Sequence, residues 1–516
     1  MAFKKYNATK DNTITNAFGI DISTRATGSN MGAADILEVF SLYGQQTTSS
    51  AELSRVLIQF PIDKISADRD AETIPASGSV RFMLKLTNAR HSEQLPRDFT
   101  FNVLAISQSW EEGYGLDMES YKDKTKDSII GSNWVMRSRS GSWGRPGGEY
   151  HTASYVAGTT MPQYKQQFYS GEENLFLDVT AAVEEWIAGT QQNYGFGVFL
   201  TSSFESYFSS STGQNTGSIL HNTDGQTTSY YTKRFFSRTS EFFFRRPHIE
   251  ARWDSRITDD RNNFYYSSSL APAEDNLNKI YLYNYVRGQL RNIPAVGTGD
   301  VLISIYSGSA DNTSPSGSKL ALSVGGNVAN AGDFNITGGF VSTGIYSASF
   351  AFTGSSDLKT IYDVWHGAGI EYFTGSITPK TLSSPGHNHG SSFETKINNL
   401  KPKYGKDEQA RLRVFIRPRN FTPTIYSIAR SEIEQTVIPS ASYEVLRMAD
   451  MHKVVNNSTG SATNHTYLSY DVSGSYFDFD MSTLEPGYMY GFKFIYHIAD
   501  DWREQEDIFK FRVEDN

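Results

Sequence analysis

The segment Leu177–Leu200, with the sequence LDVTAAVEEWIAGTQQNYGFGVFL, predicts a strand end, a short helix, a turn and a second strand in one run. Asp178 and Thr180 are residue types that favour the N-terminus of a helix, and they stand just before a helical pattern. Apolar residues then recur at helical spacing, and a glycine follows where it would end the helix. These positions are Val183, Trp186, Ile187 and Gly189.

The turn and the strand that follow complete this unit. Asn193 and Gly195 flank the turn, and residues 196–200 alternate as an inward-facing strand would require. The order indicates a single helix that covers the edge or end of a sheet. We therefore assign Asp178 and Trp186 structural roles, in capping and packing, and no role in catalysis.

The composition favours a large β protein with sizeable cores. Of the 516 residues, 38% are hydrophobic and 14% aromatic, including 30 Tyr and 33 Phe, and aromatic residues favour strands. The absence of cysteine excludes disulfides, thiolate zinc sites and cysteine nucleophiles. A net charge of −9 argues against nucleic-acid binding, and the sequence lacks the apolar run of about 18 residues that spans a membrane. The polar N-terminus lacks the apolar core of a secretory signal, so we expect synthesis in a cytoplasm.

Strand-length apolar patterns divide the chain into three blocks and indicate an all-β fold. We expect a jelly-roll β-sandwich with one short helix over residues 1–253, followed by two immunoglobulin-like β-sandwiches over 254–391 and 392–516. The expected strands are 35–40, 55–60, 80–87, 101–107, 196–200 and 242–253 in the first block, 279–285, 301–306, 344–352 and 372–377 in the second, and 410–416, 443–448, 465–472, 476–480, 488–497 and 508–513 in the third.

Ordered landmarks across residues 9–253 carry a family resemblance. They are TKDNTIT, the N-x-G of Asn30 and Gly32, DILEVF, SRVLIQFPIDKI, SVRFMLKL, SWEEG, LDVTAAVEEWIAG, NYGFGVFL and the closing SRTSEFFFRRPHIEARW. In this order they resemble the DNRLRE-type domain, a jelly-roll sandwich similar to carbohydrate-binding modules and found in long extracellular and surface proteins. The chain departs from that family in long insertions near residues 121–170 and 201–232, which puts any inherited ligand site in doubt.

The third block carries a second landmark, LEPGYMY. Leu484, Pro486, Gly487 and Tyr490 are similar to the tyrosine corner of fibronectin type III and related sandwiches, which implies that the Tyr490 hydroxyl bonds a backbone group across the corner. The whole chain, with its jelly-roll head, immunoglobulin-like C-terminal blocks and lack of cysteine, looks like structural proteins of tailed bacteriophages, especially marine ones. That likeness implies a place in the virion.

The motif SWEEG sets two carboxylates beside an aromatic residue. Glycosidases use a carboxylate pair about 5–10 Å apart. Glu111 and Glu112 are adjacent, so on a strand they point to opposite faces and do not easily form that pair. The better interpretation is that Trp110 packs in the core while one glutamate makes a structural ion pair or hydrogen bond. Without a nucleophile elbow, P-loop, dinucleotide fingerprint or HExxH, we assign no catalytic residue and no cofactor.

Two short clusters have metal-ligand chemistry. His387 and His389 in GHNHG would project to one side of an extended segment and could hold a metal at a symmetry axis, although two ligands fall short of a closed site. The alternative is a solvated, glycine-rich loop. Asp254, Asp259 and Asp260 offer oxygen ligands of the kind that calcium takes, but without EF-hand spacing. A charged hinge between domains is the better interpretation of these three residues.

Two further features concern surfaces. The run Phe235–Arg246 interleaves arginine with aromatic residues and could stack bases or sugars, but strand alternation would bury Phe242 and Phe244 instead. The long polar stretches 121–150 and 201–232 are better candidates for contact surfaces, and the second of them looks mobile or ordered by a partner.

These observations predict a non-enzymatic structural protein of a tailed-phage particle, in the capsid, neck or tail. It would assemble with other virion proteins and with copies of itself through the long loops of the first block. The alternative is a glycan-binding adsorption protein that presents the jelly-roll domain to host surface polysaccharide. That alternative predicts exposed aromatic side chains along a concave face of a sheet.

Overall fold

The computed structural model describes residues 2–19, 21–44, 51–90, 96–116, 131–227, 230–308, 314–330, 332–354, 357–381, 392–422, 425, 435–457, 465–498 and 501–515. The chain divides into two compact units. The first comprises Met1–Asp254, Ser458–His465 and Ser482–Glu485, and the second comprises Ser255–Asn457, Thr466–Met481 and Pro486–Asn516. Apart from Asp254, Ser458–His465 and Ser482–Glu485, the predicted blocks 254–391 and 392–516 fall in this second unit, where each forms its own sheets. Their independence as domains stays a prediction.

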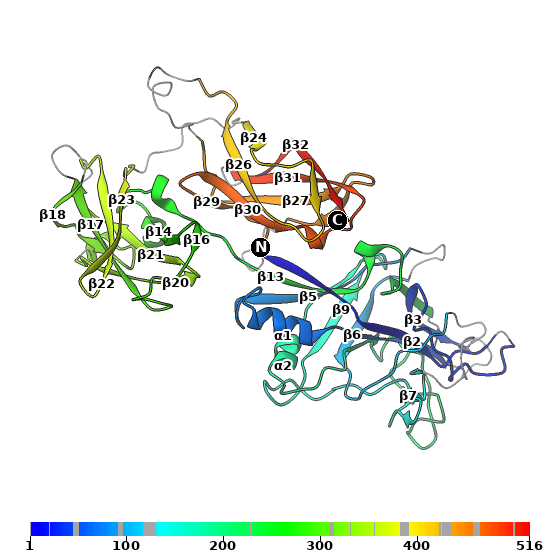
Figure 1. Ribbon diagram of the computed structural model, residues 1–516. Coiled ribbons are helices and arrows are strands. Elements are labelled where there is room, and N and C mark those ends of the chain that lie inside the picture. Colours follow the sequence, from blue (N-terminus) through cyan, green and yellow to red (C-terminus); the bar gives the residue numbers. More distant parts are fainter. Residues whose placement is uncertain are drawn as a thin grey trace. The chain divides into compact units, whose positions relative to one another are not determined.

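The first unit is a sandwich of two antiparallel sheets (Figure 1). One sheet has the strand order β1-β13-β5-β10, and the other has the order β12-β3-β4-β11-β6-β9 with β2 paired to β4. The strands are β1 Phe3–Asn7, β2 Lys10–Thr15, β3 Ile36–Tyr43, β4 Ala51–Gln59, β5 Val80–Leu86, β6 Phe99–Ala105, β9 Gln163–Phe168, β10 Leu175–Asp178, β11 Phe196–Leu200, β12 Tyr230–Phe236 and β13 His248–Trp253, with a small hairpin of β7 Met136–Ser138 and β8 Gly141–Ser142.

Alternation along the strands builds the main core of this unit. In β5, Phe82 and Leu84 are fully buried between the sheets while Arg81 is exposed, as the two-residue period of a strand requires. Phe101 and Phe168 bring their rings within 5.1 Å on the facing sheet. This core therefore rests on large aromatic and aliphatic side chains from both sheets.

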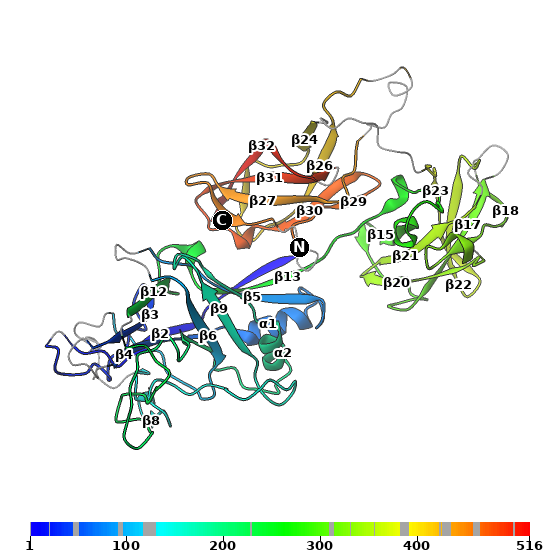
Figure 2. The ribbon, with the colours of Figure 1, turned by 180° about the vertical axis from the view of Figure 1, so that it is seen from behind.

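Two α-helices lie side by side in this unit, α1 Ile62–Asp70 and α2 Thr180–Ile187 (Figure 2). The expectation of one short helix was therefore incomplete. Helix α1 follows Pro61 and buries only Ile62 and Ile65, so its apolar face is too narrow to give a helical period in the sequence. Of the helices in the described residues, none is long and apolar enough to cross a bilayer.

The first sandwich of the second unit has the strand order β14-β21-β20-β17-β22-β23. Strand β20 pairs with both β21 and β17, so one continuous sheet folds over a core that includes the fully buried Trp365. Its strands are β14 Leu277–Tyr283, β15 Tyr285–Val286, β16 Gln289–Leu290, β17 Val301–Gly308, β18 Pro315–Lys319, β19 Leu322–Ser323, β20 Ile336–Ser342, β21 Ile345–Phe352, β22 Ile361–Gly367 and β23 Ile370–Ile377.

The second sandwich has the strand order of an immunoglobulin domain. Its sheets are β24-β26-β30-β29 and β25-β32-β31-β27-β28, which correspond to strands A-B-E-D and to G-F-C with one added strand at each edge. Strand β25 pairs with β32 in parallel. The strands are β24 Phe393–Ile397, β25 Lys403–Gly405, β26 Gln409–Pro418, β27 Ala441–Arg447, β28 His452–Val455, β29 Ser469–Asp471, β30 Gly474–Asp480, β31 Met489–Ile498 and β32 Asp501–Glu514.

An aromatic cluster fills this sandwich where antibody domains have a disulfide and a tryptophan. Phe492 lies two residues after Tyr490 on the F-type strand β31, which is the position of the second cysteine in antibody domains. Tyr443 on β27 stacks on Phe477 of the facing strand β30 with ring centroids 4.4 Å apart, and Phe477 packs edge-on against Phe492 at 5.1 Å. Ring packing between the two sheets thus takes the place of a covalent link.

Tyr490 occupies the place that the tyrosine-corner resemblance gives it. It is fully buried near the start of β31, after the connection from β30. Its ring packs against Phe511 at 6.0 Å. The hydroxyl-to-backbone bond of the corner stays a prediction.

The predicted strands are displaced mainly at turns. The expected strand 242–253 begins only at His248, because η1 Phe243–Arg245 forms a short 3-10 helix before it. As a result Phe242 is 45% exposed, whereas strand alternation predicted that it is buried. The expected strand 465–472 shortens to β29. The sequence patterns missed further strands, among them β1, β2, β9, β12, β20, β22 and β24.

The aromatic cluster gives a first prediction. Phe492→Ala should lower the free energy of unfolding by about 3–5 kcal/mol, because it removes a buried ring and leaves a cavity between the sheets. Chemical denaturation of the whole chain, followed by circular dichroism, measures the effect. The matched control is Met489→Ala on the same strand, which is 48% exposed and should change the free energy by less than about 0.5 kcal/mol. Equal effects for the two variants would contradict the packing described here.

Candidate functional site

Strand β4 is buried on both of its faces, which decides where the first unit can bind a ligand. Val56 and Ile58 face the main core between the sheets. Leu53 and Leu57, on the opposite face, belong to a second apolar cluster that we call the second core. Its members are Ile14, Leu53, Leu57, Ile106, Trp110, Trp134, Trp143 and Leu220, with Tyr150 and Tyr194 packed against them.

The second core comes from the long insertions of the first block. Trp134 and Trp143 lie between residues 131 and 150, and Leu220 lies in the stretch 201–227. Trp134 is fully buried, and its indole N–H donates to the carbonyl of Ser218 at 2.7 Å. The insertions therefore cover the outer face of the larger sheet around β4 with the chain's own side chains.

A buried ion pair holds one insertion to this face. Arg55 projects from β4 and binds Glu205 through two guanidinium nitrogens, at 2.7 and 3.1 Å from the same carboxylate oxygen. The two side chains are 9% exposed. Rings of Phe199 and Trp134 lie 4.4 and 5.6 Å from the guanidinium carbon. The pair is desolvated, so removal of one partner would leave an uncompensated charge inside the protein.

The stretch 201–227 is folded onto the domain, where the sequence suggested a mobile loop. Backbone bridges join Ser206 to Gln226 and Phe208 to Asn222. The Asn16 amide also donates to the carbonyl of Ser218 at 3.1 Å. The described part of this insertion is thus a structural layer.

The SWEEG residues take part in internal contacts. Trp110 is 4% exposed, and its indole N–H donates to the Tyr194 carbonyl at 2.8 Å. Glu112 accepts two hydrogen bonds from the Arg238 guanidinium, at 2.6 and 2.7 Å. Glu111 accepts the backbone N–H of Arg139 at 2.9 Å. The two glutamates therefore have separate structural partners.

Asp11 lies beside the Glu112–Arg238 pair and is fully buried. Its carboxylate accepts the backbone N–H of Arg238 at 2.6 Å, and its own N–H donates to Glu112 at 2.7 Å. Burial raises the pKa of Asp11 to about 7, and the nearby negative charge of Glu112 adds to that effect. Three ionisable groups thus meet inside the fold. None of the cavities described for this structure is lined by them, so these cavities give a substrate no access to the three groups.

Helix α2 has the predicted packing but a different N-cap. Trp186 is 6% exposed and packs on Phe196 with ring centroids 4.8 Å apart. The N-cap residue is Val179, and Asp178 accepts the backbone N–H of Thr180 at 3.0 Å from one position earlier. Gly189 follows the last turn with φ +71°, as expected of a C′ glycine.

Among the described residues, the candidate metal ligands do not form a site. His387 and His389 lie outside the described residues. Asp259 accepts the N–H of Arg261, whereas Asp260 accepts the N–H of Lys279 and the hydroxyl of Tyr470. Over the part of the chain that is described, no three His, Asp or Glu side chains converge as a metal site requires.

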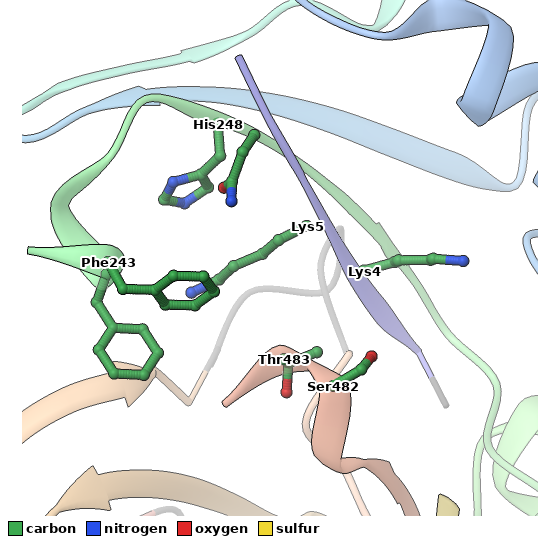
Figure 3. A pocket seen from close by; sticks show the side chains of 8 residues that line it. Lys4, Lys5, Phe243, His248, Ser482 and Thr483 are labelled. Atoms are coloured by element: carbon green, nitrogen blue, oxygen red, sulfur yellow. The ribbon is translucent and has the colours of Figure 1, made fainter. Parts of the chain in front are cut away.

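A small pocket of about 100 Å³ lies beside β1 in the first unit (Figure 3). Lys5 extends from β1 toward the phenylalanine-bearing turn, while Lys4 points the other way. Burial lowers the pKa of Lys5 to about 8 and that of His248 below its usual value. His248 Nε2 lies 3.0 Å from Glu250 Oε1, and Glu250 also binds Arg252, so these charges serve mainly to satisfy one another.

An exposed apolar surface lies at one end of the C-terminal sandwich. Tyr488, Met489 and Met451 are 39%, 48% and 51% exposed, and Met448 donates its backbone N–H to the Met489 carbonyl at 2.9 Å. The guanidinium of Arg447 lies 5.2 Å from the centre of the Tyr488 ring. We call Met448, Met451, Tyr488 and Met489 the methionine–tyrosine patch. Methionine and tyrosine adapt well to protein surfaces, and exposed apolar groups of this kind mark contact sites.

Comparisons with known proteins add little to this description. No family model matches the chain, and no curated protein matches it. Among solved structures, the crystal structure of DIP-gamma IG1+IG2 is similar at 13% sequence identity, with a TM-score of 0.13, over 46% of this chain and 90% of that chain. At that TM-score the likeness carries no argument, so the fold assignment rests on the strand order.

Sequence reasoning did not identify Glu205 as the partner of Arg55, nor Asp11 as a buried acid. One signal was available: Arg55 interrupts the otherwise apolar run of SRVLIQF, and a charge inside a buried strand needs a partner. The partner itself lies 150 residues away, in a polar stretch with no pattern that singles it out.

The buried ion pair gives a second prediction. Glu205→Ala should lower the free energy of unfolding by about 3–5 kcal/mol, because it leaves Arg55 charged and unpaired. It should also make the stretch 201–227 sensitive to limited proteolysis, which mass spectrometry of the fragments would locate. Arg55→Met combined with Glu205→Leu is the matched control, since it removes both charges and should restore most of the stability. A stable, protease-resistant Glu205→Ala protein would show that the pair does not hold the insertion.

Asp11 gives a third prediction, on pH. The folded state holds its proton up to about pH 7, whereas the unfolded chain releases it near the ordinary value of 3.8. Stability should therefore fall as pH rises through this window, by roughly 1.4 kcal/mol for each pH unit at most. Asp11→Asn should be free of this loss, and denaturation at pH 4, 5.5 and 7 would measure the difference. The exposed acid Asp224→Asn is the control, and a pH profile equal to wild type in Asp11→Asn would refute the assignment.

Proposed function

We propose that the chain is a non-enzymatic structural protein of a tailed-bacteriophage particle, which assembles with other virion proteins and with copies of itself. The observation that carries the assembly proposal is the methionine–tyrosine patch. Three of its side chains, Met451, Tyr488 and Met489, expose 39–51% of their area at one end of a sandwich. Methionine and tyrosine are enriched in protein–protein interfaces relative to other surfaces.

The setting in a phage particle rests on sequence resemblance. The ordered landmarks of the DNRLRE-type domain, followed by immunoglobulin-like sandwiches in a chain without cysteine, are similar to structural proteins of tailed phages. Two immunoglobulin-like sandwiches in the second unit agree with that combination. A density map of the particle would determine whether the chain lies in the capsid, the neck or the tail.

The internal contacts of the SWEEG motif support a structural function over a hydrolytic one. Glu112 is bound to Arg238, and Glu111 accepts a backbone N–H, so neither carboxylate has the free position of a general acid or nucleophile. Glu112 instead joins strand β2 to the segment that follows β12.

The alternative function, glycan binding by the jelly-roll domain, has less support. It requires aromatic side chains exposed along a sheet face, yet on the outer face of the larger sheet Trp134 and Trp143 are buried in the second core. A polysaccharide would have to bind another surface of the first unit. Phe242 and Tyr169, at 45% and 65% exposure, are aromatic residues that remain accessible there.

A substitution in the patch tests the assembly proposal. Met451→Glu combined with Met489→Glu should raise the dissociation constant of self-association at least tenfold, about 1.4 kcal/mol, because two carboxylates would have to be desolvated in the interface. Sedimentation velocity of the purified chain measures association. The same variant should be depleted from purified particles when it competes with the wild-type chain.

Met451→Leu with Met489→Leu is the matched control, because it keeps the surface apolar and should leave association unchanged. Localisation of the chain in a density map of the particle settles its position. Absence of the protein from purified particles would overturn the virion assignment, and wild-type association by the double glutamate variant would overturn the role of the patch.

A further inference from the structure

A polar cavity with aromatic walls lies in the second unit, apart from the patch and from the SWEEG motif. Its volume is about 310 Å³, within the range of small-molecule sites. Part of its wall comes from η2 Asp260–Asn262 and the residue before it, and part from β14 and β23. The lining residues are Asp259, Arg261, Tyr281, Tyr283, Phe373, Gly375, Ser376 and Val472.

Two buried polar atoms of this cavity lack partners. Asp259 is 1% exposed, and its Oδ2 has no hydrogen-bond partner among the described residues. The buried hydroxyl of Tyr283 likewise has none in the described part of the chain. An unsatisfied buried polar group costs about 1–3 kcal/mol, so two such groups on one cavity indicate that something outside the chain satisfies them.

The rest of the wall is fixed in place by an ion pair. Arg261 binds Asp363 through both guanidinium nitrogens, one of them at 2.7 Å, and Asp363 is fully buried. Gly375 makes room for this pair, because a Cβ there would lie 2.4 Å from Arg261 Nη1 and 2.6 Å from Asp363 Oδ1. The charge of Arg261 is thus neutralised before any ligand arrives.

The charges of the wall restrict the class of ligand. Arg261 is already paired with Asp363 and so offers no free charge to an anion, and burial raises the pKa of Asp259 to about 7, so its neutral form, which attracts no cation, is accessible near neutral pH. A hydroxyl group both donates and accepts, and can therefore satisfy the Asp259 carboxyl and the Tyr283 phenol together. The rings of Tyr281 and Phe373 offer apolar surface beside these polar groups.

We propose that this cavity binds a neutral, hydroxyl-bearing ring of monosaccharide size, with Asp259 and Tyr283 as its hydrogen-bonding residues and Phe373 as an apolar wall. The site lies in the second unit and uses neither the jelly-roll domain nor the methionine–tyrosine patch. It is therefore a separate binding function, and it does not depend on the assembly proposal.

The experiment uses the whole chain and free sugars as probes. Glucose, galactose, mannose and N-acetylglucosamine are each titrated and followed by saturation-transfer NMR and calorimetry, with tetramethylammonium chloride and sodium phosphate as charged probes. We expect saturable binding of at least one sugar and none of either charged probe. Tyr283→Phe should weaken that binding about threefold to tenfold, the effect of one lost hydrogen bond, and Phe373→Ala should weaken it as well.

Tyr285→Phe is the matched control, because Tyr285 is 59% exposed on the next strand and does not line the cavity, so binding should be unchanged. Circular dichroism confirms that each variant is folded. Three results would overturn the proposal: no sugar binds at about 100 mM, where a millimolar site is saturated; a charged probe binds in place of the sugars; or Tyr283→Phe and Tyr285→Phe bind equally well.

Discussion

The first unit depends on the burial of strand β4 from both sides. A sheet in a two-layer sandwich normally has one face on the core and one in water. Here Val56 and Ile58 face the main core, and Leu53, Arg55 and Leu57 face a second core that the insertions supply. Burial on this second side would leave the charge of Arg55 uncompensated, and the ion pair with Glu205 compensates it. The insertions are consequently part of the fold, and the outer face around β4 is closed to ligands.

The second unit meets a related constraint without cysteine. An immunoglobulin sandwich must join its two sheets, and antibody domains do this with a disulfide beside a tryptophan. In this chain the ring contacts of Phe477 with Tyr443 and with Phe492 cross between the two sheets and fill the same space. Aromatic pairs contribute beyond their buried area, which gives a physical reason for the high Phe and Tyr content of the sequence.

The sequence predicted what local periodicity determines. The all-β class, helix α2 with Gly189 at its end, and the burial of Trp110, Trp186 and Tyr490 follow from short-range patterns. The sequence suggested Asp178 or Thr180 as the N-cap of α2, whereas the N-cap residue is Val179 between them. Asp178 accepts the backbone N–H of Thr180 from one position before the cap. Helix α1 was missed because only two of its residues are buried. Long-range pairings such as Arg55 with Glu205 carry no local signal, so the second core and the cavity at Asp259 could not be predicted.

The buried carboxylates differ in how fully the chain compensates them, and one of the incompletely compensated groups lies on a cavity. In the first unit Glu112 and Glu205 each bind a guanidinium through more than one hydrogen bond, so their burial is compensated by the chain itself. Asp363 is compensated by Arg261, whereas Asp11 in the first unit and Asp259 in the second each keep one buried oxygen without a hydrogen-bond partner among the described residues. The other oxygen of Asp259 serves the fold, because it caps η2 by accepting the N–H of Arg261. Of these two acids it is Asp259 that lines the cavity, and this is the reason to propose a ligand there.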